Sequence, residues 1–129
     1  MTEIMTPIAP GELLDKLTIL EIKSENISDS AKLANVEIER AALQSVADQH
    51  IPDTAQINAL QQALLDVNKQ LWVIEDDIRD CERAKDFGDT FVKLARAVYV
   101  TNDKRADLKK QINLALGSAL VEEKSYAQY

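Results

Sequence analysis

The sequence has few of the residues that punctuate or cross-link a chain: one cysteine, three glycines and three prolines among 129 residues. With only Cys81, no internal disulfide can form, and the scarcity of glycine and proline disfavours many strands joined by tight turns. Hydrophobic residues nevertheless make up 46% of the chain, enough for a core without disulfides or structural metal. These absences favour a single helical domain over residues 1–129.

Two further absences exclude classes of binding partner. No apolar run approaches the ~20 residues that a membrane span needs, and Pro7 and Pro10 interrupt the start of the chain before a signal peptide could form. The net charge is -7, which opposes binding to phosphate backbones. We therefore expect a cytoplasmic protein with no nucleic-acid or membrane partner.

The first half of the chain predicts an extended leader over residues 1–9 and two helices. Pro10 suits a first helical position, and the helix from about Pro10 to Asn26 is apolar around most of its circumference, as expected of a central core helix. Ser28, Asp29 and Ser30 are N-cap candidates for a second helix that ends near Gln49.

The second half predicts a long antiparallel hairpin of helices at about 53–86 and 89–116. Asp53 and Gln56 resemble a capping box, Gly117 suits the residue after the last turn, and residues 118–129 form a tail that docks or lies free. Along the first of these helices, apolar residues recur at spacings of three and four and form an apolar seam. The seam residues are Ile57, Leu60, Leu64, Val67, Leu71, Ile74, Ile78 and Cys81. The fold class is therefore all-α, an antiparallel bundle of about four helices dominated by this hairpin, with the first two helices packed against it.

The hairpin is longer than the rest of the domain can cover. A helix of some 30 residues spans about 45 Å, whereas a compact chain of this size has a radius of gyration of about 14 Å. Its apolar seam would meet water where it overhangs, unless a second copy covers it. We therefore expect a homodimer or higher homo-oligomer.

Polar side chains interrupt or flank the seam halfway along the hairpin. On each of the two helices, a second row of residues runs beside the seam at the same spacing of three and four. If these two rows face each other, they form a cluster suited to a small anionic ligand, with cationic partners, amide donors and an aromatic wall. Polar residues in a helical seam also fix register and oligomer state, and this reading stays open. The candidate binding residues are Trp72, Glu75, Arg79, Arg96, Tyr99, Asn102, Arg105 and Lys109.

No catalytic constellation, metal site or cofactor motif emerges from the sequence. The acidic run Glu75, Asp76, Asp77 and Asp80 has no flanking histidine and is typical of a solvated face. His50 falls at a helix end, and Cys81 falls in the seam, where a buried thiol is expected.

Several strings resemble a family of short, uncharacterised bacterial proteins: GELLDKLTILEIKSENI, LWVIEDDIRDCE, FVKLARAVYVTNDKRADLKKQIN and VEEKSY. They cover most of the chain. The resemblance implies no assigned activity, and related segments beside glycosyltransferase or tetratricopeptide regions would place it in cell-envelope glycan metabolism. Its polar positions are Glu12, Asp15, Lys16, Glu21, Trp72, Glu75, Asp76, Arg79, Arg96, Asn102, Asp103, Arg105 and Lys109.

The leading functional hypothesis is a non-enzymatic, self-associating helical binding or scaffolding protein. The alternative is an enzyme or binding protein for a phosphorylated or carboxylated metabolite held in the hairpin's polar layer. A third reading is a regulator that uses the acidic outer face or the tail.

Overall fold

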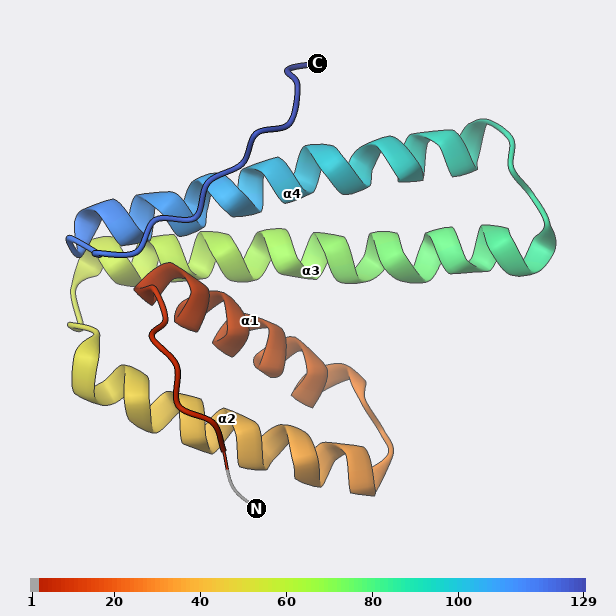
Figure 1. Ribbon diagram of the computed structural model, residues 1–129. Coiled ribbons are helices and arrows are strands. Elements are labelled where there is room, and N and C mark those ends of the chain that lie inside the picture. Colours follow the sequence, from red (N-terminus) through yellow and green to blue (C-terminus); the bar gives the residue numbers. More distant parts are fainter. Residues whose placement is uncertain (1–2) are drawn as a thin grey trace.

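The computed structural model describes residues 3–129 as four helices (Figure 1): α1 Pro10–Asn26, α2 Ser30–His50, α3 Ala55–Ala84 and α4 Asp89–Ala115. No strand occurs in this part of the chain, so the all-α prediction is confirmed. Residues 3–9 are not helical, and residues 1 and 2 of the predicted leader lie outside the described residues. None of the helices is long and apolar enough to cross a membrane.

Side-chain caps begin two of the four helices, α2 and α3. The Asp29 side chain accepts a hydrogen bond of 2.8 Å from the Lys32 amide at the start of α2. At the start of α3 the cap is Thr54, whose hydroxyl accepts a bond of 3.2 Å from the Ile57 amide. The predicted capping box at Asp53 is therefore wrong, because Thr54 occupies the cap position and the Asp53 carboxylate accepts from the Asn58 side-chain amide instead.

The end of α4 has the predicted glycine stop. Gly117 has a φ of +63°, a left-handed conformation that glycine adopts without steric cost. Its amide donates to the Leu114 carbonyl and the Ser118 amide donates to the Asn113 carbonyl. These two bonds form a Schellman motif, which satisfies carbonyls left free at the helix end.

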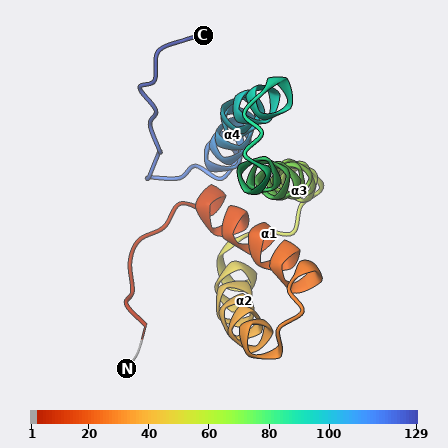
Figure 2. The same cartoon turned by 90° about the vertical axis from the view of Figure 1, so that its right-hand side faces the viewer.

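The four helices are stacked so that α1 lies between α2 and the α3–α4 hairpin (Figure 2). This confirms α1 as the central helix. We expected both of the first helices to pack on the hairpin, but α2 contacts only α1, so that expectation is wrong for α2. Because α1 is apolar on more than one side, it covers the hairpin with one face and receives α2 on another.

The core lies in the proximal half of the hairpin, which contains the start of α3 and the end of α4, where α1 covers it. Leu13, Leu14 and Leu17 of α1 pack there with Ile57, Leu64 and Ile112. The distal half of the hairpin extends beyond α1 and α2 (Figure 1). Between Asn68 and Thr101 the only buried residue is Cys81, which confirms the predicted burial of its thiol.

The start of α1 lies against the last turns of α4. The Gly11 amide donates a hydrogen bond of 2.7 Å to the Asn113 side-chain oxygen. A Cβ atom at Gly11 would lie only 2.4 Å from the Lys109 backbone oxygen. Glycine is therefore required here by the close approach of the two backbones.

We predict that Gly11→Ala lowers the free energy of unfolding by about 1–3 kcal/mol, the usual cost of overpacking. The clash outweighs the gain in helix propensity, which is about 1 kcal/mol. Urea denaturation measures the change. Gly88→Ala is the matched control, because its new Cβ would meet only the Asp86 side-chain oxygen, at 3.3 Å. Equal stability of the two variants would contradict the role given to Gly11.

Candidate functional site

A buried carboxylate on α1 joins three helices. Asp15 is 0% exposed, and its carboxylate accepts hydrogen bonds of 2.9 Å from the Asn68 side-chain amide on α3 and from Nε of Arg105 on α4. Nη2 of Arg105 donates to the second Asp15 oxygen, so the ion pair is bidentate. The Asn68 amide also donates to the Thr18 hydroxyl at 2.8 Å, and this hydroxyl donates to the Asp15 carbonyl. The buried network therefore holds the Arg105 side chain in place on the side that faces α1.

The guanidinium of Arg105 has donors left over. An arginine offers five N–H donors, and the two hydrogen bonds to Asp15 leave three of them. The hydrogen bond to Asp15 raises the pKa of Arg105 above its ordinary value and outweighs the opposing effect of burial. The side chain is 30% exposed and lines a pocket. Arg105 is thus a permanently charged, oriented donor at the pocket wall.

We call this pocket the fork pocket, because α1, α3 and α4 line it, and α1 diverges from the hairpin toward its C-terminal end (Figure 1). Its volume is about 430 Å³. The wall combines apolar side chains from all three helices with charged and amide groups from α3 and α4. The lining residues are Ile19, Ile22, Asn68, Leu71, Trp72, Glu75, Asp76, Arg79, Val98, Asn102 and Arg105.

Five of the eight candidate binding residues predicted from the sequence line this pocket: Trp72, Glu75, Arg79, Asn102 and Arg105. Arg96 and Tyr99 do not. Arg96 precedes Arg105 by nine residues, about two and a half turns of helix, and therefore lies on the opposite side of α4. Its Nε donates to the Tyr99 hydroxyl at 3.4 Å, and both side chains are exposed.

Lys109, the eighth candidate, belongs to a separate cluster nearer the base of the hairpin. Its Nζ lies 2.6 Å from a Glu12 carboxylate oxygen and 2.9 Å from one of Glu122 in the tail. Burial alone lowers the pKa of Lys109, but the hydrogen bonds to Glu12 and Glu122 outweigh it, so the net pKa is raised. Lys109 is therefore held as an ammonium group that ties α1 and the tail to α4.

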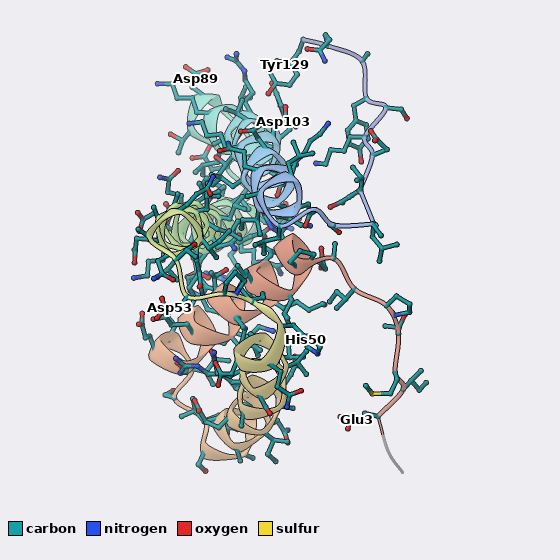
Figure 3. All side chains as sticks on the ribbon, turned by 90° about the vertical axis from the view of Figure 1, so that its left-hand side faces the viewer. Glu3, His50, Asp53, Asp89, Asp103 and Tyr129 are labelled. Atoms are coloured by element: carbon teal, nitrogen blue, oxygen red, sulfur yellow. The ribbon has the colours of Figure 1, made fainter. Side chains whose placement is uncertain are left out.

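The tail docks on α4, which settles the question that its sequence left open. Besides Glu122, its last residue is anchored: the Tyr129 hydroxyl donates to the Asp103 carboxylate, and Figure 3 shows Tyr129 directed toward α4 at this point. The ring of Tyr129 also packs edge-on against that of Tyr99, with centroids 5.1 Å apart. The hydrogen bond to Asp103 raises the pKa of Tyr129.

Sequence reasoning missed most of the network behind Arg105. Asp15 was named only as a polar position of the family strings, and Thr18 was not singled out. A signal was present, because Asp15 and Thr18 are polar residues three positions apart on a helix that is otherwise apolar on several sides. Such positions need buried partners. Asn68 and Arg105 are those partners, at a matching level of the hairpin.

The acidic run on α3 does not gather into a metal site in the described part of the chain, where no group of three metal-ligating side chains occurs. Asp76, Asp77 and Asp80 are exposed, as predicted for a solvated face. Glu75 pairs with Arg79 at 3.3 Å, and Asp80 pairs with Arg83. His50 is the exposed last residue of α2 (Figure 3).

Comparison with known proteins identifies one relationship. Residues 4–129 match DUF6165, described as a family of unknown function. The chain belongs to this family. No curated protein and no solved structure matches the chain significantly. Membership in the family therefore assigns no activity to the chain.

We predict that Arg105→Met lowers the free energy of unfolding by about 3 kcal/mol, because it leaves the Asp15 carboxylate buried without a countercharge. The double variant Asp15→Asn with Arg105→Met is expected to recover part of this loss, since the buried charge is removed as well. Urea denaturation of the complete mutant cycle measures the coupling.

The matched control is Arg79→Met, whose partner Glu75 is more than half exposed, with an expected loss below about 1 kcal/mol. Similar losses for Arg79→Met and Arg105→Met would show that the Asp15–Arg105 pair has no special structural role.

Proposed function

We propose that this protein is a binding protein and that its ligand is a small molecule that presents a carboxylate to Arg105 in the fork pocket. One observation supports this most directly. Arg105 is held by the fully buried Asp15 through two hydrogen bonds, keeps three N–H donors that Asp15 does not use, and lines an open pocket. A planar guanidinium with free donors matches the two oxygens of a carboxylate.

The preorganisation of Arg105 reduces the cost of binding. A free arginine side chain loses rotamer entropy when a ligand immobilises it, whereas Arg105 is already held by its contacts with α1. The pocket volume of about 430 Å³ falls in the usual range for small-molecule sites. Trp72 and the aliphatic side chains of Ile22 and Leu71 supply the apolar surface that the body of a ligand would cover.

Trp72 makes the proposal directly measurable, because it is the only tryptophan in the chain and lines the pocket. We expect titration with butyrate, valerate and caproate to change the Trp72 emission in a saturable way. Arg105→Lys keeps the positive charge but loses the planar fork, and it should raise Kd about tenfold. Thermal melting of each variant checks that it is folded.

Arg96→Lys is the control for this experiment, because it makes the same change on the opposite side of α4. It should leave Kd unchanged. A Trp72 emission that no carboxylate alters, or an equal loss of affinity in both lysine variants, would refute the proposal.

A second candidate function is self-association through the distal half of the hairpin. The observation that favours it is the lack of buried residues there: Cys81 is the only one between Asn68 and Thr101. Val73 is 56% exposed and Val92 is 50% exposed, and the seam residues around them are only half-buried. A second copy laid along this surface would continue the helical packing that α1 provides in the proximal half.

For this candidate we expect light scattering on a sizing column to give a homodimer at micromolar concentration. The combined change Val73→Glu and Val92→Glu should shift the protein to a monomer, because it places charges in the proposed interface. Ile38→Glu is the control, since Ile38 is exposed on α2, away from the hairpin. A monomeric parent protein at that concentration would exclude self-association of this kind.

A further inference from the structure

The charges around the fork pocket do not suit a dianion. Arg105 is compensated by Asp15 directly behind it, and Arg79 is paired with Glu75 at 3.3 Å. Asp76 also lines the pocket, and it forms no ion pair within residues 3–129. Counting these five groups, the pocket has one negative charge in excess, in a chain whose net charge is -7. A second anionic group on the ligand would therefore meet repulsion, whereas a cationic group would meet attraction.

Arg105 and Asp76 lie at different levels of the pocket, and Arg79, which is paired with Glu75, lies about one turn beyond Asp76. Asn68 and Arg105 bond the same Asp15 oxygen, which places Arg105 level with Asn68 on α3. Asp76 follows Asn68 by eight residues, which is about 12 Å along the helix axis at 1.5 Å per residue. A hydrogen bond of about 3 Å at each end leaves about 6 Å between the two charged groups of a bridging ligand.

Between these two levels the wall is largely apolar, and its one charged group, the Glu75 carboxylate, is paired with Arg79. Trp72 and Leu71 lie on α3 between Asn68 and Asp76, and Val98 of α4 lines the same stretch. Asn102 of α4 adds an uncharged amide to this stretch. A short methylene chain suits such a surface, because it covers apolar side chains without placing a charge there.

We infer that the fork pocket binds a zwitterion, with its carboxylate on Arg105, its ammonium group at Asp76 and a short aliphatic body across Trp72. This inference rests on the proposed function and adds the ammonium end, the spacing and the exclusion of dianions. The ligand class is that of an amino acid whose ammonium group is several carbons away from its carboxylate.

The test uses matched series of probes and the emission of Trp72. The zwitterions γ-aminobutyrate, δ-aminovalerate and ε-aminocaproate are compared with butyrate, valerate and caproate, with the dicarboxylate adipate and with inorganic phosphate. We expect the best zwitterion to have a Kd about threefold to fivefold below that of the alkanoate of equal length, the effect of an exposed ion pair. Adipate and phosphate should bind more weakly than caproate.

Two variants test whether the ammonium group of the ligand binds at Asp76. Asp76→Asn should abolish the advantage of the zwitterion, so that a zwitterion and the alkanoate of equal length bind the variant with the same Kd. Asp77→Asn is the matched control, because Asp77 is the next residue, is also exposed on α3 and does not line the pocket. It should leave both Kd values unchanged. The advantage of the zwitterion should also shrink at high salt, since the pair at Asp76 is exposed.

The outcomes separate this inference from the proposal on which it rests. Saturable binding of caproate with no gain for any zwitterion, tighter binding of adipate or phosphate, or a gain that survives Asp76→Asn would overturn the zwitterion and leave the carboxylate site at Arg105 standing. Absence of any response to caproate and to the zwitterions would overturn both.

Discussion

The arrangement of the helices depends on one buried charge. Asp15 is fully enclosed, and an isolated carboxylate in that environment would cost several kcal/mol. It is tolerated because Asn68 of α3 and Arg105 of α4 both donate to it, which fixes the axial position of α1 against both helices of the hairpin. Apolar packing alone would permit α1 to slide along the seam, whereas the bidentate pair is satisfied at only one level.

The same pair couples structure to the candidate site. Because α1 is fixed at Asp15 and at Gly11, its C-terminal part diverges from the hairpin at a defined place, and the fork pocket lies there. The group that holds the helices together is also the group that presents free donors to the pocket. A stability role and a binding role for Arg105 are therefore not alternatives.

The sequence predicted the local structure well because helix ends and apolar periodicity are local properties. The bounds of α1 at Pro10 and Asn26, the glycine stop at Gly117 and the burial of Cys81 all follow from nearby residues. Partners that are distant in the sequence were harder to predict: periodicity assigns a residue to a face but does not say which helix covers it. Asp15 was therefore not paired with Arg105. Arg96 could have been excluded from the site by counting turns along α4.

The central position of α1 has a consequence for the order in which the protein forms during synthesis. α1 leaves the ribosome before its partners, because Asn68 and Arg105 follow Asp15 by 53 and 90 residues and Asn113 follows Gly11 by 102. Until α4 has been synthesised, a nascent chain has a helix with uncovered leucines and an uncompensated carboxylate. Contacts of such long sequence separation slow folding. The transient exposure of that apolar face makes the half-finished chain prone to aggregate.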